Sequence, residues 1–179
     1  MAPHLQLILG GARSGKSRYA LRQGNEADFN PRLYLATASA GDEEMKSRIA
    51  QHRKERDASW QTVEEPYHLP ETLRQSASHE KGLVIVDCTT LWVSNLLCGM
   101  GGKALSIPEI KLEFEKLIQV LPRLKGNIFM VSNEVGLGIV PDNPLGRNFR
   151  DLQGDLNQTL ASIANQVILM AAGIPQKIK

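Results

Sequence analysis

The stretch that decides the fold is Gly10-Gly11-Ala12-Arg13-Ser14-Gly15-Lys16-Ser17, which fits the pattern G-x-x-x-x-G-K-[ST]. Before it, residues 5–9 form an apolar run that predicts a buried strand, and after it residues 18–22 predict a helix without a breaker. Strand, glycine-rich loop and helix stand in the order that a phosphate-binding loop requires. The glycines allow successive backbone N–H groups to point at phosphate oxygens, and the helix N-terminus adds partial positive charge.

Two side chains of this stretch have predicted roles in nucleotide chemistry. Lys16 is expected to reach the β- and γ-phosphates, and Ser17 is expected to hold Mg²⁺. The simpler alternative is a glycine-rich turn beside a surface lysine. Because the strand and the helix flank the loop in the required order, we favour the phosphate-binding interpretation.

Length, charge and composition narrow the class of protein. The 179 residues predict one domain, residues 1–179, large enough to bury most of its apolar surface. A net charge of +2 and a pI near 8.6 are too mild to indicate a nucleic-acid surface. Cys88 and Cys98 form neither a CxxC pair nor a metal cluster, which predicts a reduced, cytoplasmic protein. We expect no signal peptide and no membrane insertion.

Short apolar runs recur along the chain with helical segments between them. This rhythm predicts an α/β fold, a mostly parallel sheet with helices on both faces. The clearest helix begins after Ser106, where Pro108 and Glu109 supply an early proline and a capping box, and it extends through about Leu121. The predicted strands are residues 5–9, 32–36, 60–63, 83–87, 128–132 and 167–171.

An acid ends one of these apolar runs. In Leu83-Val84-Ile85-Val86-Asp87, four apolar residues precede the carboxylate, and such an acid beside a phosphate-binding loop organises magnesium directly or through water. An acid at a strand end is also common as a turn or cap residue. Together with the loop at residues 10–17, the metal-site interpretation of Asp87 is favoured.

The segment 42–56 predicts a helix with an acidic start and a basic end, which suits the helix dipole. Met45, Ile49 and His52 fall on one face of it, so the imidazole shares the side that the apolar residues bury. From the sequence alone His52 is either an ordinary half-buried helix residue or a nucleophile among arginines. Glu64 and Glu65 are either acids at the start of a helix or acceptors for a base or ribose.

These patterns together resemble a known family, the bifunctional adenosylcobinamide kinase/adenosylcobinamide-phosphate guanylyltransferases of cobalamin biosynthesis. The resemblance runs from the first strand to residue 179. Of the strings that carry it, the phosphate loop alone is shared by many unrelated enzymes, whereas the segments 48–56 and 132–141 are much more specific. The strings are GGARSGKS (10–17), YLATA (34–38), R-I-x-x-H-R-x-x-R (48–56), VDCTTLW (86–92) and S-N-E-V-G-x-G-I-V-P (132–141).

The resemblance implies a two-step enzyme that acts on a corrinoid. It would phosphorylate adenosylcobinamide with a nucleoside triphosphate, ATP or GTP, and then transfer GMP from GTP, carried on His52, to the new phosphate. It also implies a RecA-like P-loop fold, Mg²⁺ held by Ser17 and Asp87, and a homotrimer. The implied nucleotide-binding residues are Gly10, Gly11, Ala12, Arg13, Ser14, Gly15, Lys16, Ser17, Ala36, Thr37, Ala38, Arg53, Lys54, Glu55, Arg56, Glu64 and Asp87.

Two alternatives from other classes remain open at this stage. A P-loop kinase of another small molecule would use Lys16 and Asp87 but would not need His52. A GTP-binding switch or metallochaperone-type protein would bind GTP without an acceptor, although the chain has no N-K-x-D string to recognise guanine. The polar, glycine-containing segment 133–144 is expected to be a substrate-side loop or a contact between subunits.

Overall fold

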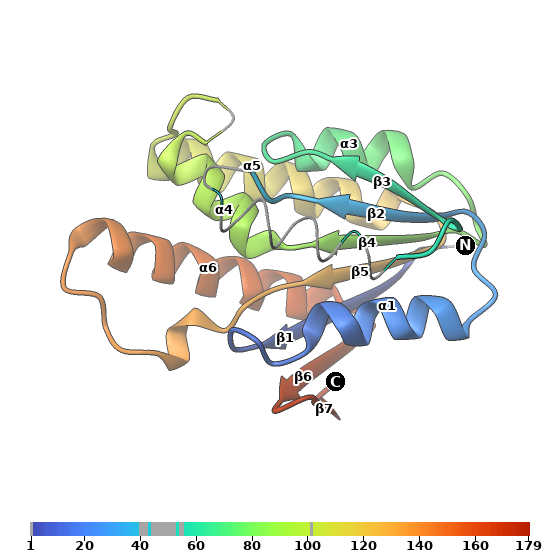
Figure 1. Ribbon diagram of the computed structural model, residues 1–179. Coiled ribbons are helices and arrows are strands. Elements are labelled where there is room, and N and C mark those ends of the chain that lie inside the picture. The colour runs from blue at the N-terminus through green and yellow to red at the C-terminus, as the bar shows by residue number, and fades with distance from the viewer. Residues whose placement is uncertain (1, 40–42, 44–52, 54–55, 101) are drawn as a thin grey trace.

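The strand before the phosphate-binding motif lies inside a seven-stranded sheet with the order β3-β2-β4-β5-β1-β6-β7 (Figure 1). The structure is a computed structural model and describes residues 2–39, 43, 53, 56–100 and 102–179. Six of the strands run parallel, and β7 pairs antiparallel with β6. The strands are β1 His4–Gly10, β2 Arg32–Ala36, β3 Trp60–Glu64, β4 Leu83–Asp87, β5 Asn127–Val131, β6 Gln166–Ala171 and β7 Ile174–Lys177.

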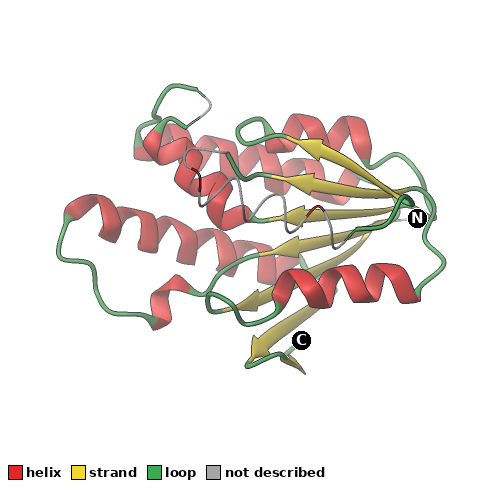
Figure 2. Cartoon of the chain, in the orientation of Figure 1, coloured by secondary structure: helices red, strands yellow, loops and turns green. Residues whose placement is uncertain are grey.

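Helices cover both faces of this sheet (Figure 2), as the sequence predicted. One face packs against α1, whose Leu21 joins a core cluster with Ile8 and Trp60. The other face carries the remaining described helices, which supply Leu69, Trp92 and further residues to a second, larger cluster. The helices are α1 Lys16–Glu26, α3 Leu69–Ser76, α4 Thr89–Cys98, α5 Ile107–Val120 and α6 Pro144–Ile163, with short 3-10 turns η1 Leu121–Arg123 and η2 Val135–Leu137.

The local signals in the sequence explain most of these elements. β4 is a continuous apolar run because a parallel sheet covered on both faces buries both sides of its strands. At the start of α5, the backbone N–H of Ser106 donates to the Glu109 carboxylate at 2.7 Å, as the capping box predicted. For the six predicted strands, each predicted end lies within one residue of the observed end.

Strand β7 is absent from the sequence-based expectations. All four of its residues are exposed, so it lacks the apolar run that marked the other strands. Pro175 is tolerated there because the strand pairs only with β6. The turn before β7 also reaches the phosphate-binding motif, since the Gly173 N–H donates to the Ser14 carbonyl at 3.0 Å.

The parallel order brings the carboxyl ends of β1, β2, β4 and β5 to one edge of the sheet. In a sheet of this kind, ligands bind at that edge. The phosphate-binding motif directly follows β1, and Asp87 is the last residue of β4. Residues 36–38 begin at the last residue of β2, at the same edge. Within the residues that the structure describes, no helix is both long and apolar enough to span a membrane.

Candidate active site

The loop at residues 10–17 is held in shape by glycine geometry and by its own lysine. Gly15 has φ 93°, in the left-handed region, and a Cβ on Gly10 would lie 2.5 Å from the Met170 carbonyl oxygen. Lys16 is only 6% exposed, and its Nζ donates to the carbonyls of Gly10 at 3.0 Å and Gly11 at 2.6 Å. Lys16 is therefore not the surface lysine of the simpler alternative.

The charge of Lys16 is set by two opposing influences. Burial lowers the pKa of its ammonium group, while the nearby Cys88 and Asp87 side chains act to raise it. The Nζ also lies 3.3 Å from the Ser14 hydroxyl, so its donors all face the inside of the loop. An anion that enters the loop can take over these donors without a large movement of the side chain.

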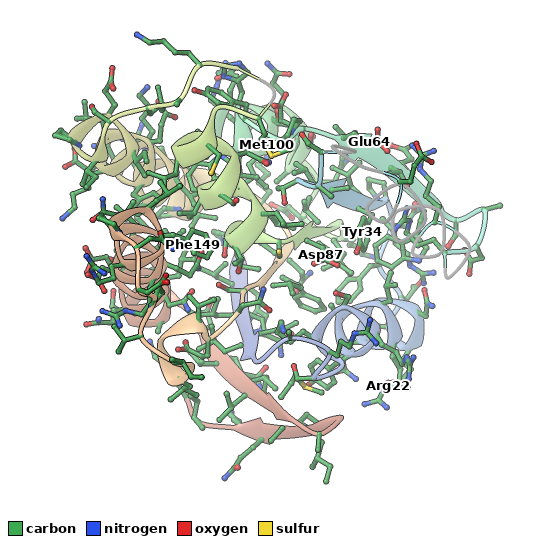
Figure 3. The ribbon with its side chains drawn as sticks, turned by 60° about the vertical axis from the view of Figure 1, so that its left-hand side comes forward. Arg22, Tyr34, Glu64, Asp87, Met100 and Phe149 are labelled. Carbon is green, nitrogen blue, oxygen red and sulfur yellow. The ribbon has the colours of Figure 1, made fainter. Side chains whose placement is uncertain are left out.

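At the end of β4, the Asp87 carboxylate accepts a hydrogen bond from the Tyr34 hydroxyl of β2. Figure 3 shows these two side chains pointing toward one another, with Glu64 farther out on β3. Burial raises the pKa of Tyr34 well above its ordinary value, and the adjacent Asp87 carboxylate raises it further, so the phenol remains a donor. The Tyr34 hydroxyl bonds one oxygen of the carboxylate, and the carboxylate is also near enough to Lys16 to act on the pKa of its ammonium group.

Tyr34 also connects the strand ends to an arginine. The guanidinium of Arg56 lies over the Tyr34 ring, 4.1 Å from its centroid. Its Nη1 is buried and, among the residues that the structure describes, has no hydrogen-bond partner. A buried guanidinium nitrogen without a partner is a favourable position for an anionic ligand. Sequence reasoning missed Tyr34, because a tyrosine within an apolar strand gives no local sign of a polar contact.

Beside Asp87, buried polar groups fix the ends of β2 and β4 to each other. The Thr37 hydroxyl accepts from the Cys88 N–H at 2.8 Å and donates to the Cys88 carbonyl at 2.6 Å. The Asn95 amide donates to the Thr37 carbonyl at 2.7 Å. Thr37 is fully buried, whereas Ala36 and Ala38 on either side are half-buried. The side chain of Thr37 thus holds the backbone of its neighbours in place.

A second feature is a hollow of about 480 Å³ along one face of β3, from Trp60 at the start of the strand to Glu64 at its carboxyl end. We call it the arginine hollow. Arg53 forms an ion pair with Glu64 across it, and both side chains are about half exposed to solvent. Two cations and two acids therefore surround a space large enough for part of a nucleotide. The residues that line it are Arg53, Arg56, Asp57, Trp60, Thr62 and Glu64.

The two glutamates that the sequence left open have different roles. Glu64 belongs to β3 and pairs with Arg53. Glu65 accepts hydrogen bonds from the backbone N–H groups of Tyr67 and His68 at 2.8 Å, immediately before α3 begins. Glu65 is therefore an acid at the start of a helix, and only Glu64 faces the arginine hollow.

The structure brings the predicted site residues that it describes into two neighbouring groups. The phosphate loop, residues 36–38 and Asp87 form one group, and Arg53, Arg56 and Glu64 form the other. The contacts from Arg56 to Tyr34 and from Tyr34 to Asp87 link them. His52, Lys54 and Glu55, and most of the predicted helix 42–56, lie outside the described residues.

A buried loop lysine after β1, with an acid at the end of the nearby strand β4, defines a P-loop nucleotide-binding protein. A KaiC-like protein from Pyrococcus horikoshii shares the fold, with a TM-score of 0.52 and 14% identity over 93% of this chain and 70% of that one. The family model described as cobinamide kinase / cobinamide phosphate guanyltransferase matches residues 6–178, and the chain belongs to this family.

Curated relatives agree with this assignment over almost the whole chain. The chain is 46% identical over 173 residues to the bifunctional adenosylcobalamin biosynthesis protein CobP of Pseudomonas aeruginosa, covering 97% of this chain and 96% of the relative. It is 41% identical over 182 residues to the bifunctional adenosylcobalamin biosynthesis protein CobU of Escherichia coli, covering 97% and 98%. The family resemblance found in the sequence is confirmed, and the protein is an enzyme of the kinase and guanyltransferase type in cobalamin biosynthesis.

Proposed function

We propose that this protein catalyses two consecutive steps on a corrinoid. It phosphorylates the aminopropanol hydroxyl of adenosylcobinamide, and it then transfers GMP from GTP to that phosphate, giving adenosylcobinamide-GDP and pyrophosphate. The observation that supports this most directly is the presence of two neighbouring groups of cations, the phosphate loop and the arginine hollow, which Tyr34 links through its contacts with Arg56 and Asp87. The chain, residues 1–179, acts as one nucleotide-binding catalytic domain in this proposal.

In the kinase step the phosphate loop holds the nucleoside triphosphate. Backbone N–H groups of residues 10–15 and the α1 N-terminus bind its phosphates, and Lys16 transfers its donors from the loop carbonyls to the β- and γ-phosphates. The Ser17 hydroxyl and the Asp87 carboxylate are hard oxygen donors, the type that Mg²⁺ takes in phosphoryl-transfer sites. When bound there, Mg²⁺ neutralises charge on the phosphates.

In the guanylyl step we propose His52 as the carrier of GMP. A neutral imidazole attacks the α-phosphorus of GTP, pyrophosphate leaves, and the phosphoramidate then passes GMP to the corrinoid phosphate. Arg53 and Arg56 neutralise charge on the nucleotide, and the unpaired Nη1 of Arg56 supports this role. The nucleotide-lining residues of this proposal are Ala36, Thr37, Ala38, Arg53, Lys54, Glu55, Arg56, Glu64 and Asp87.

We further infer a cytoplasmic enzyme without membrane insertion or nucleic-acid partners, assembled as a homotrimer. The segment after β5 supports contacts between copies, because Leu137 is 83% exposed and Ile139 95% exposed. Light scattering on the purified protein gives the mass of the assembly. A monomer at micromolar concentration would contradict the trimer without affecting the proposed chemistry.

Labelling with α-labelled GTP tests the guanylyl step. The wild-type protein is expected to form an adduct that is acid-labile and alkali-stable, as a phosphohistidine bond is, and His52→Asn is expected to form none. Phosphorylation of adenosylcobinamide is expected to survive in the same variant, because that step needs the loop and an aligned hydroxyl rather than the imidazole.

The same experiment separates this function from a kinase of another small molecule. Melting temperature measured on both proteins is the control for folding, since a merely structural histidine would reduce stability and both activities together. A labelled adduct that still forms in the His52→Asn protein would overturn the assignment and favour the simpler kinase.

A further inference from the structure

Glu134 lies at the phosphate loop, within the segment 132–141 that resembles the family, but it has no role in the two steps proposed above. Beyond the end of β5, the chain continues alongside β1, since the Ser132 N–H donates to the Ile8 carbonyl at 3.0 Å. The Glu134 N–H then donates to the Gly10 carbonyl at 3.1 Å, the same oxygen that accepts a bond from the Lys16 Nζ. Because β5 lies between β1 and β4, this places Glu134 between the phosphate loop and Asp87 at the edge of the sheet.

A buried chain of amides and one hydroxyl holds the Glu134 carboxylate. Gln153 donates to the Ser132 hydroxyl at 2.8 Å, and that hydroxyl donates to Asn157 Oδ1 at 2.6 Å. Because Asn157 Oδ1 accepts from Ser132, the amide N–H groups of Asn157 are directed toward the loop after β5. There they donate to the Asn133 carbonyl and to Glu134 Oε1, both at 3.0 Å. The three side chains of this network are nearly or completely buried: Ser132 and Gln153 are 0% exposed and Asn157 is 5% exposed.

The arrangement has features that helix packing alone does not require. Gln153 Oε1 is buried and, within the described residues, lacks a partner, so the network keeps a buried polar acceptor that costs stability. Among the described residues no lysine or arginine forms an ion pair with Glu134, so Asn157 is the group that orients this carboxylate. One oxygen is held by the amide, and the other is left to accept a proton or a hydroxyl.

We propose that Glu134 is the residue that accepts the proton of the corrinoid hydroxyl in the kinase step, and that Asn157 is its positioning residue. This inference rests on the proposed function. The hydroxyl oxygen forms its bond to the γ-phosphorus as the bond from that phosphorus to the bridging oxygen breaks, and the electron pair leaves on the nucleoside diphosphate. The hydroxyl proton passes to the free oxygen of Glu134 and from there to water.

This role also explains why the carboxylate stands apart from the arginine hollow. The guanylyl step has a phosphate as its acceptor, which is already ionised and needs no base. A residue that removes a proton from a hydroxyl is therefore required in one step only. The two activities of the protein should respond differently to a change at Glu134.

Glu134→Gln tests the proposal because it keeps the shape and the contact to Asn157 but removes the basic oxygen. We expect the kinase kcat to fall by about 10²-fold or more, with the KM for ATP changed less than about threefold. Formation of the GTP-derived adduct and guanylyl transfer to pre-formed adenosylcobinamide phosphate should continue at the wild-type rate. A kinase kcat within about threefold of wild type, or an equal loss of both activities in a folded protein, would overturn the proposal.

Asn157→Ala tests the positioning role, with Gln6→Leu as a matched control. Gln6 is a buried amide at the opposite end of β1, where it donates to Gln166 at 2.8 Å. Loss of the Asn157 amide should lower the kinase kcat about tenfold with the KM for ATP unchanged, whereas Gln6→Leu should change only the melting temperature. Equal kinase rates for the two variants would overturn the role of Asn157.

If Glu134→Gln does not fold, Glu134→Asp gives the same test, since a shortened carboxylate should retain part of the kinase activity and all of the labelling. The proposed function fails in a distinguishable way. In that case the wild-type protein itself would not phosphorylate adenosylcobinamide, whereas failure of the inference about Glu134 leaves the wild-type activities intact.

Discussion

The phosphate loop and the arginine hollow are neighbouring parts of the candidate site, but they are built differently. In the loop, main-chain carbonyls, glycine backbone geometry and a buried lysine fix the position of each donor. In the hollow, Arg53 and Glu64 are side chains about half exposed to solvent, and Glu64 lies on the edge strand β3. Main-chain donors cannot relax when a ligand leaves, whereas exposed side chains can.

This difference suggests how each group contributes to catalysis. Phosphoryl transfer depends on preorganised charge, which a loop fixed by its own backbone supplies without reorganisation. An exposed ion pair is screened by water and contributes little to stability. Each of its two residues can therefore leave its partner and bind a ligand at a low cost in free energy. The loop should therefore be sensitive to every substitution, and the hollow should tolerate single changes.

Lys16→Ala should have the largest effect and should abolish both activities. Loss of the cation at the β- and γ-phosphates removes at least about 3 kcal/mol of transition-state stabilisation, equivalent to more than about 10²-fold in rate. Kinase rate and GTP labelling, measured on one preparation, give the result. Lys116→Ala is the control, because Lys116 lies on α5 and pairs there with Glu113 at 2.6 Å. Full activity in folded Lys16→Ala would show that the loop does not bind phosphate.

Asp87→Asn should have the next largest effect, and it should fall on the response to magnesium. The amide retains an oxygen that accepts from Tyr34, so the fold should persist, but the charge that favours the cation is lost. We expect the Mg²⁺ concentration for half-maximal kinase rate to rise at least about tenfold. A magnesium titration of wild type and variant measures it. An unchanged titration curve would mean that Asp87 has a structural role only and does not bind the cation.

Arg53→Ala should affect the hollow selectively and more weakly. We expect the KM for GTP in the guanylyl step to rise by about three- to tenfold, with the kinase step unchanged. Arg74→Ala is a matched control, since Arg74 pairs with Glu71 at 2.7 Å with similar exposure but lies on α3. Steady-state kinetics of both steps provide the measurement. A loss as large as that of Lys16→Ala would mean that the hollow is as preorganised as the loop.

Ser106→Ala should have the smallest effect, and none on activity. It removes the cap of α5, which lowers the free energy of unfolding by about 1 kcal/mol. Denaturant unfolding measures this loss, and both assays should remain at wild-type rates. If the kinase or the guanylyl rate fell together with stability, the cap of α5 would contribute to the site as well as to the fold.

The sequence predicted the phosphate loop well because its information is local. Eight consecutive residues encode the motif, and the run 83–87 has the same bounds in the structure as in the prediction. The edge strand β7 was missed because a short strand exposed on all its residues has no apolar period to detect.

Contacts between distant residues were beyond the reach of sequence patterns. The bond from Asn157 to Glu134 joins residues that are 23 positions apart, and the bond from Tyr34 to Asp87 joins residues 53 positions apart. Neither contact follows from any local period, because the topology of the sheet brings the partners together. Glu134 did carry a signal, as an acid directly beyond a predicted strand in a stretch that resembles the family.

The bond from Gly173 to Ser14 has a consequence for synthesis on the ribosome. The phosphate loop is made among the first residues, but β1 pairs with β5 and β6, and the loop is braced by the turn after β6. These partners follow more than 110 residues later in the chain, with β5 beginning at Asn127. The native neighbours of the phosphate loop therefore cannot all be in place until residue 173 has left the exit tunnel. The loop is thus synthesised early but reaches its native surroundings late.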